Sequence, residues 1–240
     1  MIFERKKEDN KHLHKIDSIA SGAFGKVGLY ENNFGRKFAI KIAKKDPKGL
    51  LNEYKILKYL KKKNICSNFL CIHGKIPDET RPAIVVDYLK NYVTLTNKLI
   101  LSLPTIDRKK IAHTVIDRVE LLHKNKVVHS DIKPQNFLVN PITLDVRLLD
   151  FGGATIITSS KTLYHPRHYT RAYFAKCREK NSYTALEMMQ NDNWALGLTL
   201  LKLLLVRSKR RLERISTHNY QRANRYLHRK LKIKKNFFEC

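Results

Sequence analysis

The chain has 240 residues and carries 48 lysines and arginines against 21 aspartates and glutamates, a formal net charge of +27. This length can bury a sizeable core within one domain. The longest apolar run, 195–206, is short for a membrane span and contains Lys202, and no apolar stretch follows the first charged residues, so we expect neither a membrane span nor a signal peptide.

The first element along the chain is a glycine-containing hairpin over residues 19–27. Gly22 and Gly25 permit a tight turn whose backbone N–H groups can approach a phosphate without an intervening side chain. A glycine pair in a hairpin is more often only a turn, and the segments that follow decide between the two interpretations.

A strand and a helix with one charged residue each follow the hairpin. The β-type run 38–41 ends in Lys41, and apolar residues recur at helical spacing over 50–60, where Glu53 lies. Taken singly, Lys41 would be a solvated strand end and Glu53 an exposed helix position. Because the hairpin, the strand and the helix follow one another in this order, we predict that Lys41 pairs with Glu53 and with the phosphates of a nucleotide.

The middle of the chain contains a buried strand and a long helix. A continuous apolar run predicts a strand over 83–86, and the helical pattern over 107–125 leads into a short strand at 127–128. The polar segment that comes next therefore begins at the end of a buried strand.

The segment 129–136, His-Ser-Asp-Ile-Lys-Pro-Gln-Asn, combines a base, a cation and a metal ligand. Asp131 can accept the proton of an attacking hydroxyl, Lys133 can neutralise a moving phosphoryl group, and Asn136 can bind magnesium. The alternative for this segment is a polar loop that ends in a proline turn.

A second candidate metal ligand, Asp150, argues against the interpretation of 129–136 as only a polar loop. Asp150 follows the alternating stretch 144–149, which predicts a strand, and precedes two glycines. A buried carboxylate at that place needs a partner, and Mg²⁺ is the natural one. Together with the preceding segment, Asp150 predicts phosphoryl transfer.

In type, spacing and order, these segments resemble the eukaryotic-type protein kinases over roughly residues 15–205. The resemblance implies an α+β, bilobal protein-kinase-like fold with a β-rich N-lobe and a helical, abbreviated C-lobe. The implied parts are an N-lobe at about 1–86, a hinge at 87–91, a C-lobe at 92–206 and a basic C-terminal segment at 207–240. The pair Lys133-Pro134 is similar to the serine/threonine class.

The resemblance also implies residue roles and cofactors. The cofactors are ATP and Mg²⁺, with Mn²⁺ as an alternative, and the metal ligands are Asn136 and Asp150. The catalytic residues are Asp131, Lys133, Asn136, Lys41 and Glu53. The residues expected around the nucleotide are Ile19, Ala20, Gly22, Gly25, Val27, Ala39, Lys41, Val86, Asp87, Leu89, Leu138 and Asp150.

Comparison with the family leads to three further expectations about the large lobe. Ser130 replaces the arginine that normally precedes the base, so we expect activity that does not require phosphorylation of the activation loop. By the same resemblance, Asp192 begins the long buried helix and steadies the backbone of the catalytic loop. The closing motif of the activation loop is either 185–187 or lies near 175–177.

The segment 154–191 leaves substrate docking open between two interpretations. Its basic and aromatic residues could favour an acidic or phosphorylated peptide, or they could fold onto the core. They are His165, Arg167, His168, Tyr169, Arg171 and Tyr173.

From Arg207 onward the chain holds 12 lysines or arginines and only two acids. This segment could bind nucleic acid through its phosphates, with steep salt dependence. Equally, its apolar residues could dock it on the large lobe, and 209–211 could serve as a nuclear address. The apolar residues are Leu212, Ile215, Tyr220, Tyr226, Leu227 and Leu231.

The compact architecture and the stretch 163–169 resemble kinases of large DNA viruses, in particular the nucleocapsid-associated kinases of baculoviruses. This resemblance implies phosphorylation of serine or threonine in arginine-rich, DNA-condensing proteins. Because a chain of +27 repels a basic substrate, nucleic acid bound to both would have to bridge them. The competing hypotheses are a pseudokinase scaffold and a nucleic-acid-binding protein with the kinase fold.

The cysteine content bears on location. The four cysteines show no paired metal-binding spacing and are too sparse for a disulfide scaffold. We therefore expect reduced cysteines and an intracellular protein, in the host nucleus or the nucleocapsid if it is viral. The cysteines are Cys66, Cys71, Cys177 and Cys240.

Overall fold

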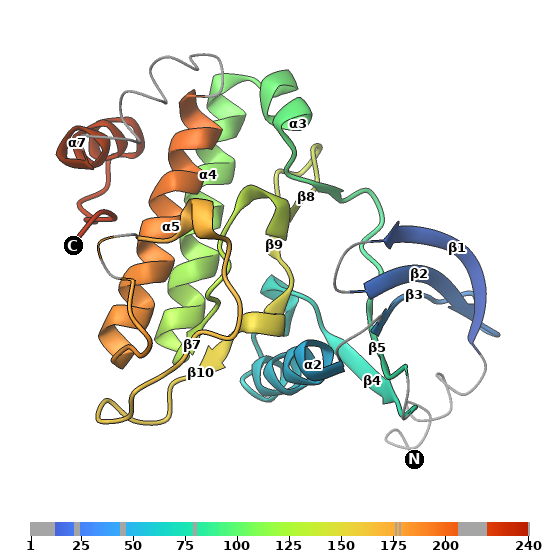
Figure 1. The fold of residues 1–240 in the computed structure, drawn as a ribbon. Helices are drawn as coiled ribbons and strands as arrows, with labels where there is room; N and C mark the ends of the chain where they lie inside the picture. The colour runs from blue at the N-terminus through green and yellow to red at the C-terminus, as the bar shows by residue number, and fades with distance from the viewer. Residues whose placement is uncertain are drawn as a thin grey trace. The chain divides into compact units, whose positions relative to one another are not determined.

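The structure is a computed structural model that describes residues 13–21, 25–43, 47–78, 81–175, 177, 179–205 and 220–239. The chain forms two compact units that divide between Lys90 and Asn91, inside the hinge expected at 87–91. Each unit is described by itself, with its elements labelled in Figure 1. Gly22, Leu212, Ile215 and the segment 209–211 lie outside the described residues.

The first unit is an antiparallel five-stranded sheet with one helix. The strand order is β1-β2-β3-β5-β4. The helix α2 contacts β3, β4 and β5 and buries its apolar stripe together with Glu53. The bounds are β1 Leu13–Ser21, β2 Gly25–Asn32, β3 Lys37–Ala43, α2 Pro47–Lys62, β4 Ile72–Ile76 and β5 Ala83–Asp87.

The register of this sheet places several predicted nucleotide residues on one face. Val27 lies opposite Lys41, and Ala39 lies opposite Val86. Since alternate residues of a strand point to opposite faces, these side chains share one face, while Phe38 belongs to a buried cluster on the other. The glutamate that pairs with Lys41 comes from α2, so α2 lies on the same side as this face.

The segment between α2 and β4 differs from the expectation drawn from cysteine content. Cys66 and Cys71 form a disulfide across a sequence separation of 5, so the prediction of reduced cysteines is wrong for this pair. A low cysteine content does not predict this disulfide, because a 3₁₀ turn, Cys66–Asn68, brings the two cysteines together. The cellular location remains a prediction.

The second unit is mainly helical and carries two small sheets. The helices α4 and α5 contact each other along their buried faces, and α7 contacts both. The sheets are β6-β8-β9 and β10-β7. The bounds are β6 Val93–Thr94, α3 Asn97–Ser102, α4 Thr105–Lys124, β7 Val127–Val128, β8 Phe137–Val139, β9 Val146–Leu148, β10 Thr155–Ile156, α5 Ala185–Leu205 and α7 Tyr220–Leu231.

The helix α5 begins at Ala185, before the start at Asp192 that the sequence suggested. Thr184 and Glu187 form a reciprocal cap: the Thr184 hydroxyl accepts from the Glu187 N–H at 3.3 Å, and Glu187 Oε2 accepts from the Thr184 N–H at 2.8 Å. The residues 185–187 form the first turn of α5, and the choice between 185–187 and the neighbourhood of 175–177 for the closing motif of the activation loop stays a prediction.

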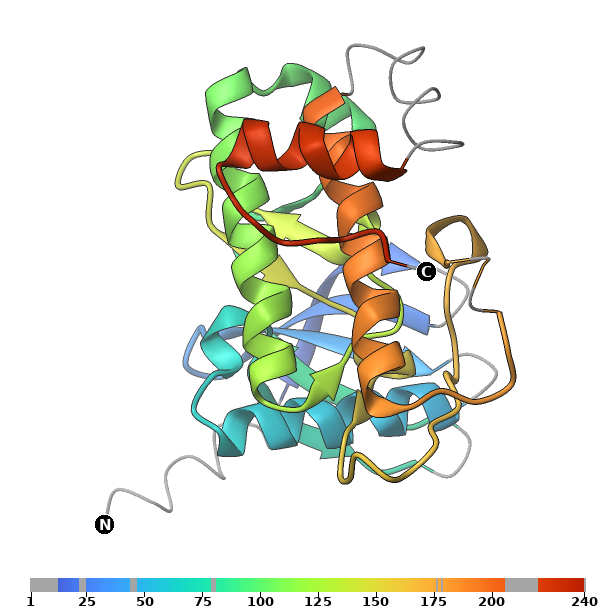
Figure 2. The ribbon, with the colours of Figure 1, turned by 90° about the vertical axis from the view of Figure 1, so that its left-hand side faces the viewer.

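The C-terminal residues dock onto the second unit. Figure 2 shows α7 crossing α4 and α5, with the segment after it running back over α5. Trp194 of α5 packs against Tyr220 at 4.4 Å and Phe238 at 5.2 Å between ring centroids. The docking interpretation is therefore confirmed for residues 220–239, whose buried apolar side chains include Ala223, Tyr226, Leu227, Leu231, Phe237 and Phe238.

None of the helices in the described parts of the chain is both long and apolar enough to span a membrane.

Candidate active site

The catalytic loop of the second unit is held in place by Asp192, as the resemblance implied. The buried Asp192 carboxylate accepts the backbone N–H groups of His129 at 2.7 Å and Ser130 at 2.8 Å. Ser130 has φ 69°, a left-handed conformation that costs free energy in a residue other than glycine. The two charge-assisted hydrogen bonds offset this cost and fix the turn from which Asp131 projects.

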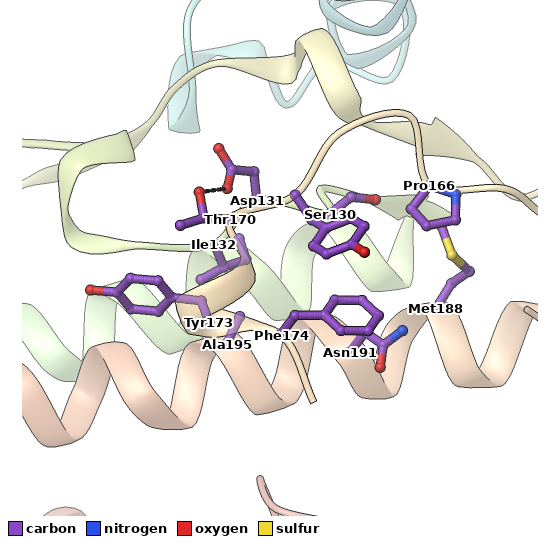
Figure 3. Close-up of a pocket in the computed structure, with 11 residues that line it drawn as sticks. Ser130, Asp131, Ile132, Pro166, Thr170, Tyr173, Phe174, Met188, Asn191 and Ala195 are labelled. Carbon is purple, nitrogen blue, oxygen red and sulfur yellow. Dashed lines mark hydrogen bonds between the residues drawn. The ribbon is translucent and has the colours of Figure 1, made fainter. Parts of the chain in front are cut away.

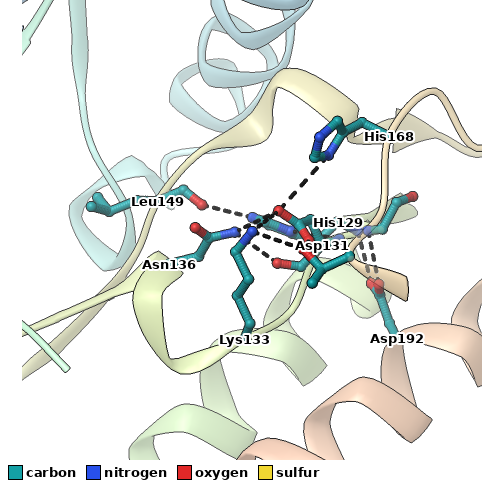
Figure 4. Close-up of polar contacts among 9 residues, drawn as sticks. His129, Asp131, Lys133, Asn136, Leu149, His168 and Asp192 are labelled. Carbon is teal, nitrogen blue, oxygen red and sulfur yellow. Dashed lines mark hydrogen bonds and ion pairs between the residues drawn. The ribbon is translucent and has the colours of Figure 1, made fainter. Parts of the chain in front are cut away.

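Asp131 lies at the centre of a cluster of donors (Figure 4). The Lys133 ammonium donates to Asp131 Oδ2 at 2.7 Å, and the Asn136 amide donates to the same oxygen at 3.1 Å and to the Asp131 carbonyl at 2.7 Å. The structure thus brings together the three side chains that the sequence predicted to share one loop.

The same contacts set the protonation of the base. Burial raises the pKa of Asp131, but the hydrogen bonds from Lys133 and Thr170 and the lysine charge outweigh it, so the pKa lies below its ordinary value. Asp131 is therefore ionised at neutral pH, and an ionised carboxylate is the form that can accept a proton from a hydroxyl.

The two predicted metal ligands lie at neighbouring strand ends. Asn136 precedes β8 and its carbonyl accepts the Leu149 N–H at 2.8 Å, which places Asp150 directly after that contact at the end of β9. Among the described residues, the hydrogen bonds of the Asn136 side chain both use its nitrogen, so its oxygen Oδ1 can serve a cation. An amide oxygen and a carboxylate are the ligand types that Mg²⁺ prefers, so these residues fit that ion.

His129 links the catalytic loop to the segment of Asp150. Its Nδ1 accepts the Asp131 N–H at 3.2 Å, so its Nε2 is the donor to the Leu149 carbonyl at 2.7 Å. Its ring also packs on buried Phe151 with centroids 5.1 Å apart. This histidine fixes Asp131, the predicted base, relative to the segment of Asp150, the predicted metal ligand, and the sequence did not reveal these contacts.

Thr170 is a second functional residue that sequence reasoning missed. Its hydroxyl donates to Asp131 Oδ1 at 2.6 Å and accepts from the Lys133 ammonium at 2.8 Å. The contact spans 39 positions and comes from a loop that has no periodic pattern. The sequence therefore contains no spacing signal for it.

A small cavity of about 10 Å³, close to the room that one water molecule needs, lies beside Asp131 (Figure 3). Two polar groups that line it, the Ser130 hydroxyl and the Asn191 amide, find no hydrogen-bond partner among the described residues. The lining residues are Ser130, Asp131, Ile132, Pro166, Tyr169, Thr170, Tyr173, Phe174, Met188, Asn191 and Ala195.

The first unit holds the other predicted ion pair. Lys41 of β3 donates to Glu53 of α2 at 2.5 Å, and the glutamate side chain is only 4% exposed. The pair joins the sheet to the helix within this unit. It also directs the lysine ammonium to the face that carries Val27, Ala39 and Val86.

The remaining residues predicted to surround the nucleotide differ in their exposure and contacts. Ile19 is 47% exposed on β1, and its neighbour Ala20 is exposed too. The Asp87 carboxylate accepts the Cys71 N–H at 3.1 Å and contacts His73 at 2.6 Å, and the Asp87 N–H donates to the Cys71 carbonyl at 3.1 Å. Gly25 begins β2, Leu89 is half-buried after β5, and Leu138 is half-buried on β8 of the second unit.

Comparison with known proteins identifies the family. Residues 13–238 match the protein kinase domain, so the chain belongs to the protein kinase family. The carbon catabolite-derepressing protein kinase of Candida glabrata is 29% identical over 209 residues, which cover 79% of this chain and 31% of the relative. The mouse dual specificity protein kinase CLK1 is 27% identical over 219 residues, which cover 79% of this chain and 44% of that protein.

A third relative, the carbon catabolite-derepressing protein kinase of Candida tropicalis, is 31% identical over 79% of this chain and 30% of its own length. The chain thus spans less than half the length of these relatives. They support the kinase resemblance and the α+β kinase fold, while the viral resemblance stays a prediction.

Proposed function

We propose that this chain is an ATP- and Mg²⁺-dependent kinase that phosphorylates serine and threonine hydroxyls of proteins. The contact of Asp131 with both Lys133 and Thr170 carries the proposal. Asp131, ionised at neutral pH, accepts the proton of the incoming hydroxyl, and Lys133 stabilises the negative charge that develops beside it. Bound Mg²⁺ would neutralise the phosphates of ATP.

Two features support aliphatic hydroxyls as acceptors. Lys133 is followed by Pro134, as in the serine/threonine class, and Thr170 occupies the space next to the base. Relatives of this chain include dual specificity kinases by name, so tyrosine is the alternative acceptor to exclude.

The test uses labelled ATP and three peptides that differ only in a central serine, threonine or tyrosine, with Mg²⁺ present or removed by EDTA. We expect label on serine and threonine, and none in EDTA. Comparable label on tyrosine would contradict the acceptor assignment. Absence of label from every peptide would favour the pseudokinase scaffold, against which the presence of Lys41, Glu53 and Asp131 argues.

We also infer that activity does not require phosphorylation of the activation segment. Contacts that need no phosphate order this segment: Tyr164 and Tyr183 exchange backbone hydrogen bonds at 2.7 and 2.9 Å, and the Tyr164 hydroxyl accepts the Thr158 and Ser159 N–H groups at 3.0 Å. Ser130 offers no guanidinium to a phosphate. Phosphatase treatment should leave turnover unchanged, and abolished turnover would refute the inference.

A second candidate function, nucleic-acid binding, rests on the outer face of α7. This helix has no acidic residue and exposes Arg225 and Arg229 at helical spacing opposite its buried face, and the exposed Lys232 follows directly after its last residue. Replacing these three residues by glutamine should flatten the salt dependence of duplex DNA binding by about 0.9 in log–log slope for each phosphate that is no longer neutralised. An unchanged slope would exclude this face.

The narrower hypothesis, a viral kinase acting on arginine-rich DNA-condensing proteins inside the host nucleus or the nucleocapsid, remains a prediction. The net charge of +27 supports it only if nucleic acid bridges enzyme and substrate. Digesting the nucleic acid should then reduce turnover of a protamine-like substrate, and unchanged turnover would count against bridging.

A further inference from the structure

In the activation segment of the second unit, residues 154–184, two arginines are next in sequence to residues that contact Asp131, the proposed base. His168 Nδ1 lies 3.9 Å from Asp131 Oδ2, and Arg167 precedes it in the chain. Thr170 donates to Asp131 at 2.6 Å, and Arg171 follows it. Each arginine is therefore the immediate neighbour of a residue whose side chain reaches Asp131, as Figure 4 shows for His168.

Among the residues that the structure describes, neither arginine holds the segment to the core. Arg167 is exposed, and the Arg171 side chain is 80% exposed with a loose 3.9 Å contact to Glu179, itself 48% exposed. Such an exposed pair contributes little and is readily exchanged for another partner. Both guanidinium groups are therefore available to a ligand.

Aromatic residues, by contrast, attach the same segment to the core. The rings of Tyr169 and Phe174 lie 4.3 Å apart, and Phe174 packs edge-on against buried Tyr183 at 6.0 Å. The two interpretations that the sequence left open thus divide by residue type: the aromatic side chains fold inward, and the arginines face solvent.

The surrounding charge favours an acidic ligand. Residues 154–184 contain six lysines and arginines and one acid, Glu179. Within the described residues, Lys180 is paired with Glu187 at 2.6 Å, whereas Lys161 is exposed on the same segment. A peptide that approaches Asp131 therefore meets a cationic segment, which attracts carboxylates and repels arginines.

We propose that this kinase selects acceptor sites flanked by acidic or already phosphorylated residues, and that Arg167 and Arg171 determine this specificity. The proposal rests on the kinase function proposed above. An extended peptide advances about 3.3 Å per residue, so residues within about three positions of the acceptor come within reach of the two side chains. Guanidinium groups bind carboxylates and phosphates with two parallel hydrogen bonds.

The test compares three peptides with the same central serine, flanked by alanines, by aspartates or by arginines. For the wild-type chain we expect kcat/KM about tenfold higher for the aspartate peptide than for the alanine peptide, as expected of charge-assisted contacts. The preference should shrink in high salt because the arginines are exposed. A wild-type preference for arginine flanks, or none at all, would overturn the proposal.

Two variants separate specificity from catalysis. In Arg167→Glu/Arg171→Glu the aspartate preference should disappear or invert, while kcat/KM for the alanine peptide stays within about threefold, as usual for surface substitutions. Turnover of that neutral peptide requires a folded enzyme, so it also reports folding. The variant Arg167→Gln/Arg171→Gln should give an intermediate ratio of kcat/KM between the aspartate and alanine peptides. A preference that persists in both double variants would overturn the proposal.

The matched control is Lys98→Glu/Lys110→Glu, which changes the net charge by the same amount as Arg167→Glu/Arg171→Glu. Lys110 is exposed near the start of α4. Lys98 is an exposed residue of α3, which precedes α4, whereas the catalytic loop follows the far end of α4, a helix of 20 residues or about 30 Å. This variant should keep the wild-type ratio of kcat/KM between the aspartate and alanine peptides. If it loses the aspartate preference as far as the arginine variants do, only net charge matters.

If the arginine variants lose duplex DNA binding but keep the peptide ratio, the two arginines bind nucleic acid and the proposal is wrong. Failure of wild-type turnover on every peptide would instead refute the kinase function.

Discussion

The hydroxyl of Thr170 donates a 2.6 Å hydrogen bond to the carboxylate of Asp131, across 39 positions of the chain. This contact joins the activation segment to the base. It also makes the order of that segment part of the chemistry, because the same hydroxyl accepts from Lys133.

Thr170→Ala should lower kcat about tenfold, the effect of losing one hydrogen bond to a charged group. The bond from Thr170 lowers the pKa of Asp131, so its loss raises that pKa and the acid limb of the kcat/KM profile should move to higher pH. Thr170→Ser keeps the hydroxyl and should restore both rate and profile. A serine variant as impaired as the alanine variant would show that the methyl group, not the bond, matters.

Glu53→Gln should reduce kcat/KM for ATP by roughly 10²-fold, because a mispositioned Lys41 no longer meets the phosphates in the reacting geometry. The amide keeps the shape of the buried glutamate but removes the charge that holds the lysine at 2.5 Å. Steady-state kinetics with varied ATP measures the loss. Leu51→Gln, on the exposed face of the same helix, is the control and should behave like the wild type.

The cap of α5 gives a prediction for stability against pH. The Lys180 hydrogen bond lowers the pKa of Glu187 to about 2, from an ordinary value near 4.5. A folded-state pKa below the unfolded one means that the ionised cap stabilises fully above pH 4.5 and loses its effect as the pH falls toward 2.

Glu187→Gln should therefore be less stable than the wild type in urea at pH 7, with a difference that narrows as the pH falls from about 5 to about 3. Denaturation midpoints across that range measure it. A difference that is constant with pH would mean that the cap acts through its shape and not through its charge.

Gly197→Ala should destabilise the second unit by about 1–3 kcal/mol, the usual cost of overpacking. A methyl group at Gly197 would lie 2.6 Å from the Phe238 ring and 2.7 Å from Phe237 Cβ, so α5 and the C-terminal segment would have to separate. Combining it with Phe238→Ala should cost less than the sum of the two single changes, as thermal unfolding can show. If the stability losses of Gly197→Ala and Phe238→Ala are strictly additive, the close contact between position 197 and Phe238 is contradicted.

Much of the site was predictable because its residues lie close in sequence or at regular spacing. Asp131, Lys133 and Asn136 belong to one loop, and their side chains meet as expected. The Lys41–Glu53 pair followed from a strand and a helix with clear periodicity. Strand and helix periods fix which face a residue occupies, and this is why these predictions succeeded.

Other features depend on contacts that leave no periodic trace. Thr170 reaches the base through an irregular loop, and the disulfide between Cys66 and Cys71 depends on a local 3₁₀ turn. The resemblance placed the start of α5 at Asp192, whereas the cap formed by Thr184 starts the helix at Ala185. The role proposed for Arg167 and Arg171 depends on which side chains of their segment are buried, and the sequence alone does not show this.

The proposed function requires that Asp131 act as the base of phosphoryl transfer. Single-turnover transfer of labelled phosphate from ATP to a serine peptide, measured for the wild type and Asp131→Asn at equal ATP saturation, tests it directly. We expect the variant to bind ATP and to unfold at the wild-type temperature, with a rate lower by about two to four orders of magnitude. A rate within a few fold of the wild type would show that another group accepts the proton.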